Sequence, residues 1–209
     1  MADEHAGLPA AAALAKRGFD VALAALGLAL ASPVMLLAWV VASIDTGANG
    51  FYAQTRIGRF GRPFRMIKIR TMRPGSDAGS TVTTANDARV TPAGRFLRRT
   101  KIDELPQLLN VLAGSMSFVG PRPDTAGFAD LLEGEDRVVL AVRPGITGPA
   151  TLKYRNEEAL LAAQADPERY NREVIFPDKV RINRKYVECY RFGEDLRLLA
   201  LTFFTRREG

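Results

Sequence analysis

An apolar segment near the start of the chain constrains the fold most. Residues 21–44 contain no charged side chain, and a helix of that length can cross a hydrocarbon core of about 30 Å. Three interpretations compete: a cleavable signal peptide with an A-x-A site at residues 29–31, a spanning helix, and a re-entrant hairpin that enters and leaves on one side. The apolar run continues well beyond residue 31, which disfavours the signal peptide.

The flanks and the middle of this segment separate the other two interpretations. Lys16-Arg17 precedes it and seven basic residues lie between Arg56 and Arg73 after it, so the positive-inside rule places both ends on the cytoplasmic side. Ser32-Pro33 interrupts the run. Proline removes a backbone donor and kinks a helix, and a serine hydroxyl can satisfy a freed carbonyl. Both observations fit a re-entrant hairpin, but the residues alone leave it level with the span.

Composition limits the chemistry. The 209 residues include one cysteine, Cys189, and one histidine, His5. This excludes a disulfide framework, a zinc site built from cysteines and a Ser-His-Asp hydrolase. Any catalysis must therefore use carboxylates, hydroxyls, lysines or arginines.

Positive charge is concentrated in one part of the chain. The net charge is +6, and residues 51–101 contain twelve Lys or Arg residues against two acids, Asp77 and Asp87. Such a block indicates a surface for anions, which include phosphorylated small molecules, lipid headgroups and nucleic acid.

The remaining pattern predicts a mainly α fold with a small β element, α+β in class. Residues 51–57 and 64–70 read as two strands around a glycine-bearing turn, with Lys68 and Arg70 on one exposed face. Residues 73–92 read as a long loop. Helices are expected from about residue 92 and over residues 103–112, 128–143, 157–165 and 178–190. The apolar residues 196–204, followed by Arg206 and Arg207, fit an interfacial helix and a core helix equally well.

The densest group of chemically capable residues is residues 94–107. Because proline is tolerated only in the first turn of a helix, Pro106 predicts a helix that starts near Asp103, with Asp103 as its cap. Asp103 and Glu104 would then lie at the positive end of the helix, beside several cations. This arrangement suits phosphoryl transfer through an aspartyl-phosphate. The alternative is that Asp103 only caps the helix and Glu104 pairs with a neighbouring arginine.

An ordered series of motifs resembles the bacterial sugar transferases of the monotopic phosphoglycosyl transferase superfamily, from about residue 16 to the 190s. The motifs are Lys16-Arg17-x-Phe19-Asp20, Ser32-Pro33, Lys68-x-Arg70-Thr71-Met72, Gly94-Arg95-Phe96-Leu97-Arg98, Ile102-Asp103-Glu104-Leu105-Pro106-Gln107, Asn110-Val111-Leu112, Met116-Ser117, Val119-Gly120-Pro121-Arg122-Pro123 and Pro144-Gly145-Ile146-Thr147-Gly148. The chain departs from the pattern at Leu109 and Ser115, where many relatives have a tryptophan and an acid, and it lacks their Trp-Gln-Val pattern after Gly148.

The resemblance implies an enzyme that moves a sugar-1-phosphate from a UDP-sugar to undecaprenyl phosphate and releases UMP. It implies that Asp103 is the nucleophile, that Glu104 helps to hold Mg²⁺, and that Arg122 contacts the nucleotide. Further expected substrate contacts are Lys68, Arg70, Arg95, Arg98, Pro121, Pro123 and Thr147.

The resemblance also implies a location and a domain plan. The enzyme would be monotopic on the cytoplasmic face of the bacterial inner membrane, in contact with its lipids, with a tail over residues 1–15, a re-entrant membrane helix over residues 16–46 held by Lys16-Arg17 and Ser32-Pro33, and a catalytic domain with interfacial C-terminal helices over residues 47–209. No nucleic-acid partner is expected, and a homodimer is compatible with the sequence.

Two rival functions use the same residues differently. A membrane-tethered module that binds nucleic acid or anionic lipid would use the arginines but would leave Asp103 and Glu104 idle, and the basic block has few interleaved aromatic residues. A catalytically silent scaffold would not need the intact Asp-Glu pair.

Overall fold

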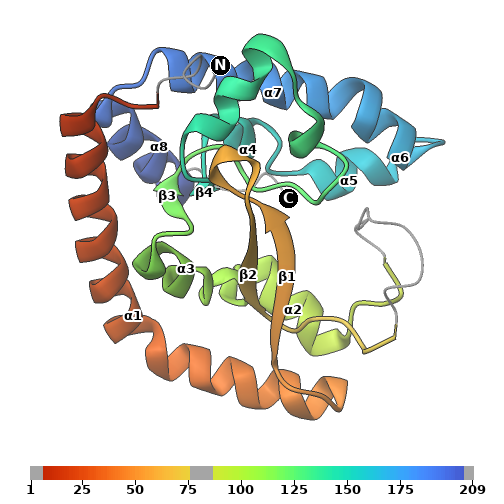
Figure 1. Cartoon of the computed structure of the whole chain (residues 1–209). Helices are drawn as coiled ribbons and strands as arrows, with labels where there is room; N and C mark the ends of the chain where they lie inside the picture. Colours follow the sequence, from red (N-terminus) through yellow and green to blue (C-terminus); the bar gives the residue numbers. More distant parts are fainter. Residues whose placement is uncertain (1–6, 76–86, 205–209) are drawn as a thin grey trace.

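A computed structural model describes residues 7–75 and 87–204, and it confirms a mainly helical chain with small sheets (Figure 1). The helices are α1 (Ala10–Thr46), α2 (Pro92–Thr100), α3 (Gln107–Ala113), α4 (Pro149–Lys153), α5 (Glu157–Ala162), α6 (Pro167–Tyr170), α7 (Phe176–Glu188) and α8 (Phe192–Phe204). The strands are β1 (Phe51–Ile57), β2 (Pro63–Ile69), β3 (Ser117–Val119) and β4 (Gly145–Thr147).

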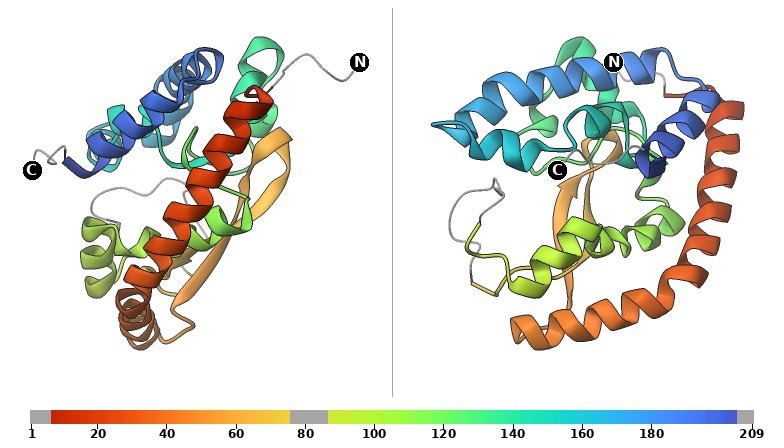
Figure 2. Two further views of the ribbon diagram at one scale, coloured as in Figure 1. Left: turned by 90° about the vertical axis from the view of Figure 1, so that its left-hand side faces the viewer. Right: turned by 180° about the vertical axis from the view of Figure 1, so that it is seen from behind.

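Helix α1 is one long, bent element. It begins at Ala10, within the segment expected to be a tail, and Pro33 lies inside it. Figures 1 and 2 show two arms joined at a sharp bend, and proline is a known cause of such a kink. The Ser32 hydroxyl donates to the Ala29 carbonyl at 3.2 Å, so the polar group beside the proline has a partner within the helix.

Much of the apolar surface of α1 is exposed. Leu30, Leu37 and Ile44 are 72%, 65% and 80% exposed, whereas Ala38 and Ala42 are buried against the rest of the molecule. By length and composition α1 is able to cross a membrane. An apolar surface of this extent marks a site of contact with protein or lipid.

The β-hairpin forms almost where the alternating pattern predicts it. Strand β1 has the predicted bounds, and β2 covers 63–69 rather than 64–70. The two strands are antiparallel and pair Phe51 with Ile69 and Tyr52 with Lys68. Arg70 therefore follows the strand instead of belonging to it.

One predicted helix starts later than expected, and another is wrong. Residues 103–112 are divided between a 3-10 turn at Ile102–Glu104 and helix α3. Residues 128–143 form two 3-10 segments, Ala129–Leu131 and Gly134–Ala141. The predicted loop over residues 73–92 lies partly outside the described residues. His5, Asp77, Arg206 and Arg207 also lie outside them.

The first arm of α1 contacts both α8 and β3. Lys16 forms a buried ion pair with Asp195 of α8, and Asp195 also accepts a hydrogen bond from Tyr186 at 2.6 Å. Asp20 accepts hydrogen bonds from the Ser117 hydroxyl and the Phe118 amide. Elements from the two ends of the chain thus form one unit.

Helix α8 combines both properties expected of residues 196–204. Leu198 is 3% exposed and belongs to the core, whereas Phe203 and Phe204 are 79% and 87% exposed. The helix is therefore a core element on one face and an apolar surface element toward its end.

Candidate active site

A cavity of about 1430 Å³ contains all the substrate-binding and catalytic positions that the sequence suggested. It is lined by residues of the β-hairpin and of helices α2, α4, α5 and α7. The predicted residues that line it are Lys68, Arg70, Arg95, Arg98, Asp103, Glu104, Pro121, Arg122, Pro123 and Thr147. The structure therefore brings together residues separated by up to about eighty positions in the chain.

A tight turn presents Asp103 and Glu104 to this cavity. Helix α2 is capped at its start by Thr91, whose hydroxyl accepts from the Gly94 amide at 3.0 Å. It ends at Lys101, which has a left-handed backbone conformation with φ 59°. The chain then forms the 3-10 turn Ile102–Glu104 before α3 begins. The expected capping role of Asp103 is wrong, because α3 starts at Gln107 and no side chain caps it.

Asp103 is buried and incompletely satisfied. The residue is 7% exposed, and its Oδ1 atom has no hydrogen-bond partner. Burial, followed by the charge of Glu104, raises the pKa of Asp103 to about 6, against the opposing effect of Lys68. A carboxylate that is ionised at neutral pH but poorly solvated is well suited to act as a nucleophile.

Glu104 has a different environment. An Arg122 Nη2 atom donates to Glu104 Oε1 at 2.7 Å, and Lys101 Nζ lies 3.6 Å from the same oxygen. Burial alone would raise the pKa of Glu104, but Arg122 and Lys68 outweigh it and hold that pKa well below the usual range. The two adjacent carboxyl groups therefore differ in charge state preference, as distinct roles require. The alternative pairing is met in part, since the partner is an arginine from a distant turn rather than a neighbouring one.

The Pro-Arg-Pro turn reaches Glu104 because strands β3 and β4 are parallel neighbours. The Gly145 amide donates to the Pro121 carbonyl at 2.8 Å, and Arg122 Nη1 donates to the Ile146 carbonyl at 3.3 Å. Glycine is needed at Gly120, because a Cβ atom there would lie 2.6 Å from the Arg143 carbonyl oxygen. The turn is thus fixed from both sides and holds Arg122 over the cavity.

Thr147, at the end of β4, is buried against α8. Its hydroxyl lies 2.8 Å from that of Thr202. This hydroxyl therefore joins the end of β4 to the C-terminal helix at the cavity wall.

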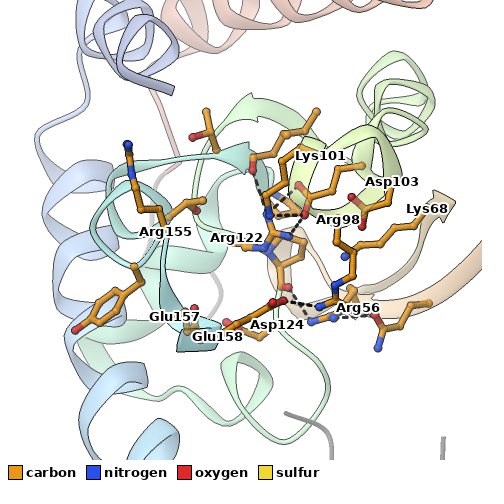
Figure 3. Close-up of a pocket in the computed structure, with 18 of the residues that line it drawn as sticks. Arg56, Lys68, Arg98, Lys101, Asp103, Arg122, Asp124, Arg155, Glu157 and Glu158 are labelled. Atoms are coloured by element: carbon orange, nitrogen blue, oxygen red, sulfur yellow. Dashed lines mark hydrogen bonds and ion pairs between the residues drawn. The ribbon is translucent and has the colours of Figure 1, made fainter. Parts of the chain in front are cut away.

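The expected phosphate-binding cations differ in availability. Arg70 donates from Nε to the Asn49 carbonyl at 2.8 Å, and its guanidinium lies over the Tyr52 ring. Arg98 forms an ion pair with Glu158, and Arg95 is exposed. Burial lowers the pKa of Lys68 to about 8. Figure 3 shows Arg122 between Asp103 on one side and Glu157 and Glu158 on the other.

Several cavity residues were missed by the sequence analysis. Arg56 belonged to the basic block, and it donates to the Pro123 carbonyl at 3.3 Å. Burial raises the pKa of Asp124 to about 6, although Lys179 and Arg56 oppose this. Thr151 and Asn183 line the same cavity from α4 and α7. Only the position of Asp124, directly after the Pro-Arg-Pro motif, was a signal in the sequence.

The four residues expected at the membrane lie outside the cavity lining. Lys16 and Arg17 join α1 to the rest of the molecule, since Arg17 donates to the Val111 and Leu112 carbonyls at 2.6 and 2.8 Å. Ser32 and Pro33 lie at exposed positions of α1.

The carboxyl groups also fit the donor chemistry of Mg²⁺. Within residues 7–75 and 87–204 no group of three or more His, Cys, Asp or Glu side chains is assembled to hold a metal. Asp103 Oδ1 has no partner and Glu104 is ionised. Mg²⁺ commonly takes one or two carboxylates and completes its shell with water and substrate phosphate oxygens, and Asp103 and Glu104 are the two carboxylates that could hold it here.

Comparison with known proteins decides the family. The family model described as "bacterial sugar transferase" matches residues 11–208 of this chain. The chain belongs to the bacterial sugar transferase family. It is 36% identical to the UDP-glucose:undecaprenyl-phosphate glucose-1-phosphate transferase of Escherichia coli (strain K12) over 197 residues, which are 91% of this chain and 40% of that protein.

Two further relatives agree with this assignment. The exopolysaccharide production protein ExoY of Rhizobium meliloti (strain 1021) is 34% identical over 199 residues, 88% of this chain and 81% of the relative. The UDP-glucose:undecaprenyl-phosphate glucose-1-phosphate transferase of Caulobacter vibrioides is 44% identical over 145 residues, 67% of this chain and 54% of the relative. The chain thus spans less than half of the Escherichia coli protein but most of ExoY. This sugar transferase is therefore an enzyme of the transferase class.

Proposed function

We propose that this sugar transferase moves a sugar-1-phosphate from a UDP-sugar to undecaprenyl phosphate and releases UMP, as the first step in assembling a membrane glycoconjugate. The observation that carries the proposal is Asp103, a buried carboxylate with an unpartnered oxygen in a cavity rich in cations. The names of the relatives supply the two substrates. A nucleic-acid module or a silent scaffold would have no use for the contrast between Asp103 and Glu104.

The proposed reaction has two displacements. An Asp103 carboxylate oxygen attacks the β-phosphorus of the UDP-sugar, and the bond from that phosphorus to the bridging oxygen breaks, so that UMP leaves. An oxygen of undecaprenyl phosphate then attacks the phosphorus of the aspartyl phosphosugar, and Asp103 is released as a free carboxylate. The double displacement splits one difficult transfer into two easier ones.

The surrounding charges have separate tasks in this scheme. Lys68, Arg98 and Arg122 attract the diphosphate and stabilise the negative charge that develops during transfer. Arg122 also holds Glu104 ionised and in place. Mg²⁺, held by Asp103 and Glu104, would supply charge neutralisation at the phosphate oxygens.

The proposed site of action is the cytoplasmic face of the inner membrane. The bend at Ser32-Pro33 and the basic residues on both flanks support a re-entrant α1 rather than a span. The exposed apolar side chains of α1 and of Phe203 and Phe204 would then contact lipid. In that arrangement the phosphate of the lipid acceptor reaches the cavity without leaving the membrane surface.

The test measures UMP release by purified protein with undecaprenyl phosphate, Mg²⁺ and a panel of UDP-sugars. We expect UMP from at least one donor and loss of more than 99% of the rate in Asp103→Asn, because an amide cannot act as this nucleophile. Asp136→Asn, which changes a half-exposed carboxylate, is the matched control and should retain activity. Retention of more than about 1% of the rate in folded Asp103→Asn would refute the covalent mechanism.

The metal assignment is tested separately. EDTA should stop UMP release and added Mg²⁺ should restore it. Turnover that resists EDTA would refute the role given to Asp103 and Glu104 as metal ligands.

A further inference from the structure

The part of the cavity formed by α4 and α7 contains a second set of unsatisfied polar atoms. Thr151 Oγ1 and Asn183 Oδ1 are buried without a hydrogen-bond partner, and both residues line the cavity. Asn183 is 8% exposed. Buried polar atoms in proteins are nearly always paired, so two orphan oxygens on residues that line one cavity indicate a ligand that pairs with them.

The charges around these oxygens are neutralised within the protein. Lys179 lies one turn before Asn183 on α7, and its Nζ donates to both oxygens of Glu157 at 2.7 and 2.6 Å. Asp124 is close enough to Lys179 for the lysine to affect its pKa. The cation nearest to Asn183 on its own face of α7 is therefore already paired with a carboxylate, and this part of the cavity suits a neutral ligand better than a phosphate.

The two orphan oxygens can be compared with the three neutral parts of a UDP-sugar, which are the uracil, the ribose and the hexose. Thr151 Oγ1 and Asn183 Oδ1 can both accept a hydrogen bond. The hexose carries several O–H donors and the ribose has two, whereas the uracil ring has one N–H donor and two carbonyl acceptors. Two unpaired acceptors therefore match hydroxyl groups better than uracil, and the hexose carries more hydroxyl groups than the ribose.

We propose that Asn183 and Thr151 form the subsite that binds the hydroxyl groups of the donor sugar and so helps to determine which UDP-sugar is used. The inference rests on the proposed function, since it assumes a UDP-sugar donor. The diphosphate would lie at Lys68 and Arg122, with the sugar extending toward α4 and α7. A site built to hydrogen-bond a hydroxyl discriminates strongly against a donor that lacks or displaces it.

The test is calorimetric titration of UDP-glucose, UDP-N-acetylgalactosamine and UMP into protein that carries Asp103→Asn, so that no turnover occurs. In that background Asn183→Ala and Thr151→Val should each weaken the preferred UDP-sugar by about tenfold or more. Each should leave the affinity for UMP unchanged within about twofold, because UMP has no sugar beyond the phosphate. Lys185→Ala, at an exposed position of α7, is the control and should change neither affinity.

The other outcomes are decisive. If the two variants weaken UMP as much as the UDP-sugar, the subsite belongs to the nucleoside and the inference is wrong. If neither affinity changes while the variants remain folded by thermal unfolding, the orphan oxygens have no ligand and the inference is also wrong. If UMP and every UDP-sugar fail to bind the Asp103→Asn protein, and the unmodified protein releases no UMP, the proposed function fails and the inference fails with it. Turnover by the unmodified protein with unaffected variants would overturn the inference alone.

Discussion

At the scale of single residues, the burial of Asp103 lowers the stability of the protein at neutral pH and provides the nucleophile of the proposed reaction. Its pKa is raised to about 6 from an ordinary value of 3.8, so the folded state favours the protonated form. The resulting destabilisation is absent below pH 3.8, develops between pH 3.8 and 6, and is complete above pH 6. A buried group of this kind persists where activity needs it.

We therefore predict that Asp103→Asn makes the protein more stable at pH 7 by up to about 3 kcal/mol, the free-energy equivalent of the pKa shift. At pH 4 the gain should nearly vanish, since the native side chain is then largely protonated in the folded state. Thermal unfolding in EDTA at the two pH values checks this. A variant that is less stable than the native protein at pH 7 would contradict the environment described for Asp103.

We expect the titration of Lys68 to set the alkaline limit of activity. Burial lowers its pKa to about 8, so the side chain loses its positive charge, and with it the attraction for phosphate, as the pH rises through 8. We expect kcat/KM for the UDP-sugar to fall above pH 8, because this ratio reports the free enzyme. Lys68→Arg keeps its charge and should remove this limb from the pH profile. An unchanged alkaline limb in Lys68→Arg would assign the titration to another group.

The sequence was sufficient to predict the candidate residues, but it did not predict how they are arranged. The charge pattern and the motifs identified Asp103, Glu104, Lys68 and Arg122. The contact of Arg122 with Glu104 depends on the parallel pairing of β3 with β4, which no local pattern reveals. Asn183 is one polar residue in an ordinary helical pattern, and only its burial beside the cavity distinguishes it.

At the scale of elements, the segments whose side-chain pattern has a clear period were predicted well. Strand β1 was predicted with its bounds, because its alternation and flanking turns are local signals. The turn around Asp103 was predicted as a helix because Pro106 is compatible with a first turn. The left-handed conformation of Lys101 redirects the chain there, and such a conformation is uncommon outside glycine and therefore hard to predict.

The prediction at this scale concerns the topology of helix α1. If α1 is re-entrant, both of its ends face the cytoplasm. Single cysteines at Ala10→Cys and Ala48→Cys, each in a Cys189→Ser background because Cys189 is exposed, should both be protected from a membrane-impermeant maleimide in intact spheroplasts. Both should react once the membrane is permeabilised.

The bend should be necessary for that topology. Replacement of Pro33 with alanine restores a backbone donor and removes the clash that kinks the helix, so the Ala10→Cys site should become reactive from outside in part of the population. Labelling of one end from outside in the unaltered helix would establish a span and contradict the hairpin.

At the scale of the whole molecule, the first arm of α1 and the C-terminal helix depend on each other. The Lys16–Asp195 pair is buried, and Tyr186 and Tyr190 donate hydrogen bonds to the same carboxylate. Since α8 also contacts the cavity through Thr202 and Thr147, this network connects the proposed membrane element with the wall of the active site. Positioning of the cavity at the membrane surface would follow from these contacts.

We predict that Asp195→Asn destabilises the protein by about 3 kcal/mol, because Lys16 then remains buried without its ion-pair partner. For a chain of this length that corresponds to a fall of about 6–12 °C in Tm, measured by thermal unfolding in one detergent. Glu194→Gln changes a partly exposed neighbour paired with Arg197 and should change Tm by less than about 3 °C. The double variant Lys16→Met with Asp195→Asn removes both charges and keeps an acceptor for the two tyrosine hydroxyls, so it should be clearly more stable than Asp195→Asn alone. Equal losses in the single and double variants would show that packing, and not the buried charge, holds the two ends of the chain together.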